Sequence, residues 1–294
     1  MSQFYSLTLD TLAPFGNTIT ATTPVNGDCS VRVTSGDNDS AYMYLWVDNK
    51  VQGDFPTDIV VGSTKWIAFA NNYTVTASEL GRAGEGALYV HGVFMDHVGN
   101  ISQVVDSNKL VYDVTNPTIK SAELVGPTGS LSGHTTSVNV NLNAVFNDIK
   151  AAGVETSGIK SYKITGNIPT EITGNFTDVE NETSKTADVN KTFAVALNPL
   201  TTQEGDEATR TVKLTVYDAA GNEMFRDNIS ILLDTVVPEA VFDMQQLRGE
   251  TYTTVVNEYV TPESEIHVII EAKSGTTDLI KYKLYGDFVG STEA

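Results

Sequence analysis

The sequence has few of the residues on which disulfide-stabilised domains and nucleic-acid-binding proteins depend. Cys29 is the only cysteine among 294 residues, so no disulfide can form within the chain and each domain must hold together by packing alone. Lysine and arginine number 18 against 37 aspartates and glutamates, which gives a formal net charge of −19. A field of this sign repels phosphate, so we expect no binding to nucleic acid.

Long apolar runs and catalytic motifs are missing as well. No stretch approaches the length of a membrane span, and residues 1–7 have neither the basic region nor the apolar core of a signal peptide. We therefore expect a chain that is made in the cytosol and leaves it, if at all, without a signal of its own. No Gly-x-Ser-x-Gly, His-Glu-x-x-His or phosphate-binding loop occurs, so we predict that the protein is not an enzyme.

Two short motifs recur along the chain instead. Asp-x-x-x-Pro follows an alternating apolar run three times and starts at Asp10, Asp113 and Asp234. Asp-x-x-Gly-Asn starts at Asp96 and Asp218, which lie 17 and 16 residues before the next Asp-x-x-x-Pro. A repeat with a period above one hundred residues indicates tandem domains. The predicted modules are 1–113, 114–234 and 235–294.

The secondary-structure pattern is almost entirely that of strands. Residues 137–146 alternate between apolar and polar side chains, as half-buried antiparallel strands do, and 209–217 repeat the pattern. Helical periodicity is nearly absent, so we predict tandem β-sandwiches of the immunoglobulin-like type without disulfides. Further strands are predicted at 30–34, 42–47, 65–69, 73–78, 88–95, 120–125, 159–164, 192–197, 265–272 and 279–285.

Each motif has a local physical explanation. In Asp-x-x-Gly-Asn, glycine adopts positive φ without steric cost while Asp and Asn bond to the turn backbone. This motif is therefore predicted to connect the last two strands of a module. Proline stops ladder pairing, so Asp-x-x-x-Pro is predicted to be the joint between modules.

Three further expectations concern particular segments. Residues 4–9 resemble the last strand of a module, although no module precedes them, and 235–294 form a module without its closing strands. We expect these two ends to contact partners, because an unfinished sandwich exposes a strand edge. Aligning 42–46 with 160–164 predicts a strand that carries the central core aromatic, which is Trp46 in the first module.

The combination of Asp-x-x-Gly-Asn, a further strand and Asp-Thr-x-x-Pro resembles the tandem bacterial immunoglobulin-like repeats of surface adhesins and phage structural proteins. The opening residues 5–14, the run 41–46 and the turn at Asp96 resemble phage virion proteins more specifically. The resemblance implies a component of a phage tail, baseplate, fibre or capsid decoration. Its partners would then be other virion proteins in a symmetric oligomer, assembled in the cytoplasm of the bacterial host.

Two kinds of binding site are candidates. Calcium prefers oxygen ligands, and the two motifs offer six: Asp96, Asn100, Asp113, Asp218, Asn222 and Asp234. Turn capping explains the same residues without a metal, so no cofactor is expected and calcium is the alternative. Trp46, Trp66 and Tyr73, with Tyr42 and Tyr44, are candidate contacts for a host glycan, although aromatic residues of a sandwich more often lie in its core.

The function that we expect from the sequence is a non-enzymatic structural protein of a tailed-phage virion. The alternatives are an adsorption protein that binds a host receptor or glycan, and a fragment of a bacterial surface adhesin.

Overall fold

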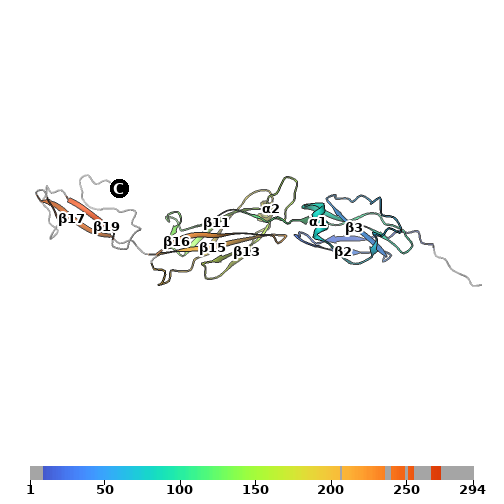
Figure 1. Cartoon of the computed structure of the whole chain (residues 1–294), viewed down its shortest axis with the longest axis horizontal. Coiled ribbons are helices and arrows are strands. Elements are labelled where there is room, and N and C mark those ends of the chain that lie inside the picture. The colour runs from blue at the N-terminus through green and yellow to red at the C-terminus, as the bar shows by residue number, and fades with distance from the viewer. Residues whose placement is uncertain (1–8, 206, 236–239, 249–250, 255–265, 273–294) are drawn as a thin grey trace, which may run out of the picture. The chain divides into compact units, whose positions relative to one another are not determined.

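The computed structural model describes residues 9–205, 207–235, 240–248, 251–254 and 266–272. The chain divides into two compact units, Met1–Asp234 and Thr235–Ala294. The first unit contains two separate hydrophobic cores, each enclosed by two β-sheets (Figure 1). The predicted all-β sandwich class is therefore confirmed.

The first module, coloured blue to green in Figure 1, contains a three-stranded sheet in the order β1-β2-β5. The second sheet has the order β4-β3-β6-β7, and β8 also pairs with β6. The elements are β1 (Thr18–Ala21), β2 (Cys29–Thr34), β3 (Tyr42–Asp48), β4 (Ile67–Ala68), β5 (Asn72–Val75), α1 (Ala77–Ala83), β6 (Gly86–Met95), β7 (Val105–Asp106) and β8 (Leu110–Tyr112).

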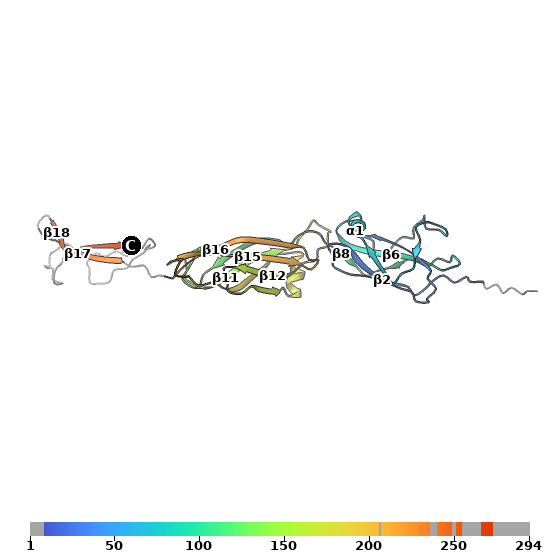
Figure 2. The same cartoon turned by 60° about the horizontal axis from the view of Figure 1, so that its bottom comes forward.

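The second module has sheets in the orders β14-β11-β9 and β10-β16-β15-β12-β13. Figure 2 shows the long strands β15 and β16 running alongside β12. The elements are β9 (Thr118–Val125), β10 (His134–Thr135), β11 (Asn139–Asn147), β12 (Ile159–Gly166), β13 (Ile172–Asn175), α2 (Asp178–Ser184), β14 (Val189–Ala196), β15 (Glu207–Asp218) and β16 (Glu223–Asp234).

The predicted alternation of β11 is confirmed. Val140, Leu142 and Ala144 are buried in the second core, whereas Asn139 and Asn141 are exposed. These inward side chains of β11 pack in one core with side chains of β14 and β15, among them Phe193 and Leu214. The buried residues of this core are all aliphatic or phenylalanine. Period-two patterning thus fixes which face of each strand is buried.

The alignment that made Trp46 the core aromatic was wrong by one residue. Met95 and Tyr217 each come directly before the Asp of an Asp-x-x-Gly-Asn turn. Met95 pairs with Tyr42, and Tyr217 pairs with Ser161, so Tyr42 and Ser161 are equivalent. Tyr162 therefore corresponds to Met43, and both side chains face their cores. A shift of one residue moves every side chain of a strand to the other face.

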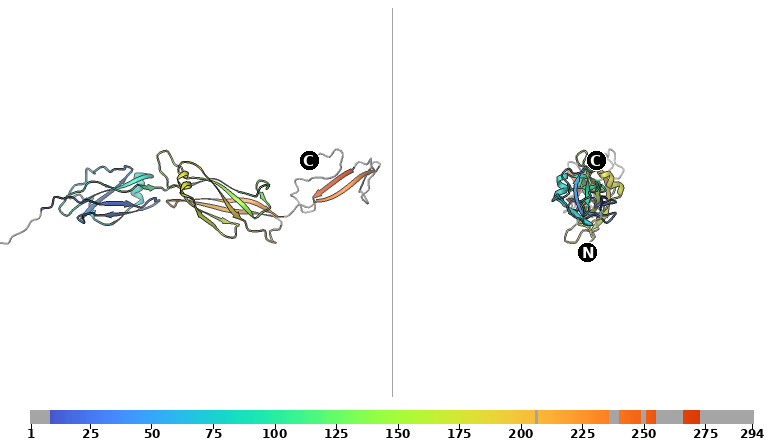
Figure 3. Two further views of the ribbon diagram at one scale, coloured as in Figure 1. Left: turned by 180° about the vertical axis from the view of Figure 1, so that it is seen from behind. Right: turned by 90° about the vertical axis from the view of Figure 1, so that its right-hand side faces the viewer.

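Two helices interrupt the predicted strand pattern. The strand expected at 73–78 ends at Val75, and α1 follows it; α2 lies between β13 and β14. Thr76 and Thr177 each form a capping box with a glutamate three residues later, Glu79 and Glu180, the arrangement that starts a helix. Both helices lie at the ends of their modules that face the joint (Figure 3). The strand expected at 65–69 is shorter and spans Ile67–Ala68.

In the second unit, β17 (Ala240–Arg248) pairs with β18 (Thr251–Thr254) and β19 (Ile266–Ala272). The expected strand 265–272 is confirmed as β19. The strands expected at 4–9 and 279–285, and with them the incompleteness of the third module, lie outside the described residues. In the part of the chain that the structure describes, no helix is long and apolar enough to span a membrane.

Candidate functional site at the joint between the modules

Both Asp-x-x-Gly-Asn segments form the predicted turns between antiparallel strands. Asp218 ends β15, and its Oδ1 accepts hydrogen bonds from the amides of Gly221 and Asn222 at 2.7 and 2.8 Å. Asp96 caps its own turn in the same way, with Gly99 and Asn100. Gly99 and Gly221 have φ of 102° and 96°, values that glycine alone adopts readily. Turn capping, one of the two interpretations of these residues, is therefore present.

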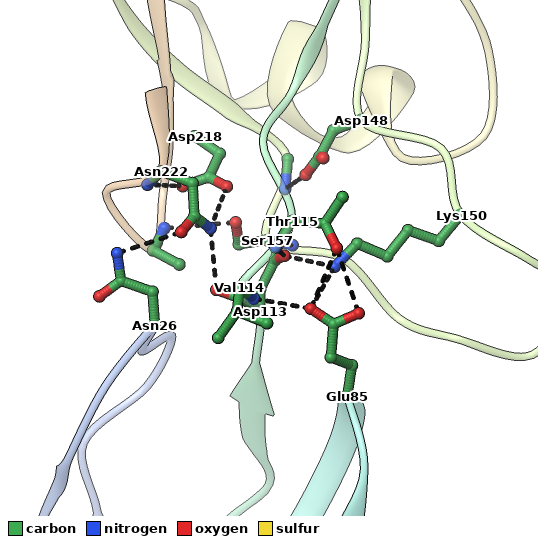
Figure 4. Close-up of polar contacts among 12 residues, drawn as sticks. Asn26, Glu85, Asp113, Val114, Thr115, Asp148, Lys150, Ser157, Asp218 and Asn222 are labelled. Carbon is green, nitrogen blue, oxygen red and sulfur yellow. Dashed lines mark hydrogen bonds and ion pairs between the residues drawn. The ribbon is translucent and has the colours of Figure 1, made fainter. Parts of the chain in front are cut away.

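Asp113, which follows β8, is the centre of the contacts between the two modules (Figure 4). Its side chain is fully buried, and its Oδ2 accepts the amide hydrogen of Ser157 at 2.8 Å. Its carbonyl oxygen accepts from Asn222 Nδ2 at 2.8 Å, and its own amide donates to the carbonyl of Val25. Asp113 thus bonds to the first module, to which it belongs, and to two segments of the second module.

Lys150 provides the positive charge of this joint. It lies in the loop between β11 and β12, and its Nζ contacts Asp113 Oδ1 at 2.5 Å and Glu85 Oε1 at 3.1 Å. The Lys150 side chain is 8% exposed. Glu85, just before β6, also accepts the amide hydrogen of Val114 and the hydroxyl of Thr115. The linker backbone is therefore held by the carboxylate of Glu85, which in turn pairs with Lys150 of the second module.

Three buried carboxylates, those of Asp113, Asp148 and Asp218, lie together at the joint, with oxygens within 4.8 Å of one another. Burial alone raises the pKa of Asp113, but Lys150 and the amide of Ser157 outweigh it and the pKa is lowered. Burial and the charge of Asp113 raise the pKa of Asp148 to about 6. The group that contacts the lysine thus stays ionised, and its neighbour takes up a proton more readily.

Lys150 itself is kept charged by its two partners. Burial lowers its pKa, but the hydrogen bonds and charges of Asp113 and Glu85 outweigh this effect, so the pKa is raised. Burial also raises the pKa of Glu85, but the Val114 amide and Lys150 reverse the direction and lower it. A buried ion pair with every partner in place constrains geometry, and losing one partner is costly.

Part of this arrangement recurs at the start of the first module, although Asp10 is exposed where Asp113 is buried. Asn100 Nδ2 donates to the carbonyl of Asp10 at 3.4 Å, as Asn222 does to Asp113. Asp10, Asp39 and Asp96 also bring three carboxylates within 4.8 Å of one another. The Asp-x-x-x-Pro motifs at Asp10 and Asp113 therefore each bond to the Asp-x-x-Gly-Asn turn of the module that follows. Proximity in the fold thus explains why the two motifs recur together.

The structure groups most of the calcium candidates but not all of them. Asp113, Asp218 and Asn222 meet at the joint, and Asp96 and Asn100 meet at the first-module turn. Asp234 ends β16 and belongs to neither carboxylate group. Whether a metal cation binds at either group stays a prediction. At the joint, Lys150 already places one positive charge against Asp113.

Sequence reasoning missed Glu85, Asp148 and Lys150, which complete the joint. None belongs to a repeated motif. Asp39 and Asp148, the carboxylates that join the two turns, lie in corresponding loops, Asp39 between β2 and β3 and Asp148 between β11 and β12, but at different distances from the flanking strands. The Thr-x-x-Glu pattern before α1 and α2 would have revealed both helices. No spacing rule would have found the three joint residues.

The aromatic candidates separate into two places. Tyr44 and Trp46 lie on the outer face of β3 with ring centroids 5.7 Å apart, and both line a groove together with Tyr73 of β5. Trp66 is not part of this groove, and its Nε1 donates to the carbonyl of Val60. The three residues predicted to form one binding surface therefore do not all meet.

No protein family and no curated protein matches this sequence. Among solved structures, the chain is similar to a tetra-tandem repeat in the extending region of a large adhesion protein. That match has 12% identity and a TM-score of 0.27, and it covers 90% of this chain and 67% of that one. A second similar structure is dimeric latent PorU from Porphyromonas gingivalis, with 13% identity and a TM-score of 0.27, covering 79% of this chain and 25% of PorU.

This chain therefore spans about a quarter of the PorU chain. At these TM-scores neither likeness carries an argument about function. Nothing in them bears on the virion assignment, which stays a prediction from the sequence.

Proposed function

We propose that this protein is a non-enzymatic structural spacer in which successive β-sandwich modules are held in a fixed relation by buried polar joints. The observation that carries the proposal is the set of contacts of Asp113, which joins its own module to Lys150, Ser157 and Asn222 of the next. A flexible linker needs none of these contacts, and burying so many polar groups is unfavourable unless each finds a partner.

The role follows from what such a joint does mechanically. Tandem modules with defined nearest-neighbour interfaces keep binding or assembly surfaces at a set separation, and their stabilities add approximately module by module. The bond from Asn100 to the carbonyl of Asp10, which matches the bond from Asn222 to Asp113, supports the same role at the start of the first module.

NMR relaxation tests this role directly in the full chain. A rigid joint gives the strand amides of both modules one common rotational tumbling behaviour, because the two sandwiches move as one body. We expect Asp113→Ala to separate them into two faster-tumbling groups. Two independent groups in the wild-type chain would remove the spacer proposal.

The particle on which the spacer acts is proposed from the sequence motifs alone. They favour a tailed-phage virion, with other virion proteins as partners, and a bacterial surface adhesin is the alternative. Immunogold electron microscopy with antibodies against this chain separates the two: label on tailed particles supports the virion, label on cell envelopes supports the adhesin, and label on neither contradicts both.

A further inference from the structure

The outer edge of β3 is less covered than the corresponding edge in the second module. There, β13 pairs with β12 over four positions, from Ser161↔Asn175 to Ile164↔Ile172. In the first module β4 pairs with β3 at only two, Tyr42↔Ala68 and Met43↔Ile67. The two edges are equivalent because Phe69 donates to Ala41 as Phe176 donates to Lys160, each one position before the paired segment.

Backbone groups are available where β4 ends. The amide of Phe69 donates to the carbonyl of Ala41, whose own amide donates to Met95 on the β6 side, and Met43 pairs with Ile67. Alternate residues from Met43 onward therefore direct their N–H and C=O groups toward this edge. Leu45 and Val47 continue that series beyond the end of β4. β3 pairs with β6 on its other side as far as Asp48, so only one edge of the strand is open.

A groove of about 540 Å³ lies along this open edge. Leu45 and Val47 of β3, Val75 of β5 and Ala83 of α1 form its apolar part. Figure 1 shows α1 beside β3, and the two elements are in contact. In the second module the position opposite Ile164 is filled by Ile172, which packs against the core. Among the described residues, no strand residue pairs with Leu45 on this edge.

The two ends of the groove differ in charge. Asp48 lies at one end. Its Oδ1 accepts hydrogen bonds from His91 Nε2 and from the backbone amide of Lys50, and its Oδ2 makes no hydrogen bond within the described residues. Lys65 lies toward the other end, with its Nζ 5.9 Å from the ring of Tyr44 and in an ion pair with Asp58; Glu79 and Arg82 of α1, of opposite charge, also line the groove. A strand that runs antiparallel to β3, as β4 does, would place its N-terminal end opposite Asp48 and its C-terminal end toward Lys65.

We propose that this groove binds an extended segment of another protein by strand addition to β3. The segment alternates apolar and polar residues, places apolar side chains opposite Leu45 and Val47, and is basic at its N-terminal end and acidic at its C-terminal end. Backbone hydrogen bonds and an apolar pocket for alternate side chains are the two parts of this recognition mode. The inference is independent of the spacer role, because none of the four apolar groove residues contacts Asp113.

The test uses the full chain and the synthetic peptide acetyl-Lys-Thr-Val-Thr-Ile-Thr-Val-Glu-amide, titrated calorimetrically. We expect binding that weakens about tenfold when the central isoleucine is N-methylated, because that amide bonds to β3. N-methylation of a neighbouring threonine, whose amide points to solvent, serves as the matched control and leaves binding within about threefold. Exchanging the terminal lysine and glutamate also weakens binding.

Two protein variants locate the site. Ala83→Lys places a long side chain in the groove and abolishes binding, whereas Ser78→Lys, on the same helix outside the groove, retains it; thermal melts establish that both variants fold. Hydrogen exchange of the amides of Leu45 and Val47 slows in the complex. Absence of peptide binding overturns the proposal, as does equal weakening by both N-methyl groups. Binding of a xylo- or chito-oligosaccharide in place of the peptide also overturns it.

Discussion

Replacing Lys150 by methionine isolates the charge that the joint depends on, because methionine keeps most of the apolar stem and removes the ammonium. Asp113 then remains fully buried beside Asp148 and Asp218 without a cation on its Oδ1. Removing one partner of a buried ion pair costs about 3–5 kcal/mol. Asp113 keeps the amide of Ser157, so we expect the lower end of the range, about 3 kcal/mol.

Native-state hydrogen exchange of the full chain measures this loss locally. The amide of Ser157 donates to Asp113 Oδ2, so its exchange reports the opening of the joint. A loss of about 3 kcal/mol corresponds to exchange roughly a hundredfold faster at pH 7. The double variant Asp113→Asn with Lys150→Met should exchange more slowly than Lys150→Met alone, because it leaves no unpaired buried charge.

Lys109→Met is the matched control at the same joint. Lys109 pairs with Glu155 of the second module at 2.6 Å, but the two side chains are 48% and 33% exposed. Exposed pairs contribute about 0–1 kcal/mol, so this variant should leave the exchange of Ser157 nearly unchanged. Equal effects of the two lysine substitutions, or no rescue by Asp113→Asn, would refute the reasoning.

Three further predictions concern the same region and its turns. The pKa of Asp148 is about 6 in the folded state against an ordinary 3.8, so the folded state holds this proton more tightly than the unfolded state. The resulting contribution to stability is present below about pH 4 and is lost as pH rises through about 6. Asp148→Asn should therefore raise the unfolding free energy by about 1–3 kcal/mol at pH 7 and change it little at pH 4, and an equal change at both pH values would contradict the shift. Thermal melts with calcium and with EDTA should coincide, since Lys150 supplies the cation at the joint; a higher melting temperature in calcium would establish a metal site instead. Gly99→Ala should lose about 1 kcal/mol or more, because Gly99 has φ of 102°, while Gly27→Ala, with ordinary φ and open space around it, should lose less than half of that in the same denaturation assay.

Much of the fold could be predicted from the sequence because strand alternation and turn chemistry are local signals. The pattern of β11 fixed its buried face, and the Gly of each Asp-x-x-Gly-Asn turn has the positive φ that the motif requires. The joint residues Glu85, Asp148 and Lys150 could not be predicted, because none belongs to a repeated motif and only tertiary packing brings the segment before β6 and the loop between β11 and β12 to Asp113.

The error at Trp46 has a simple physical origin. Strands of similar composition align equally well in two registers one residue apart, and only pairing with β6 distinguishes them. The correct register places Leu45 and Val47 inward and Trp46 on the outer face. That same register identifies the open backbone groups on which the strand-addition proposal depends.

The central claim is that the contacts of Asp113 hold the first two modules in one arrangement. Distances between spin labels test it most directly, with labels at Lys50→Cys and Val179→Cys, both exposed positions, while Cys29 stays unlabelled because it is buried. The account predicts one narrow distance distribution in the otherwise wild-type chain and a broad one when Lys150→Met is added. A distribution equally broad in both, or unchanged by the substitution, would contradict it.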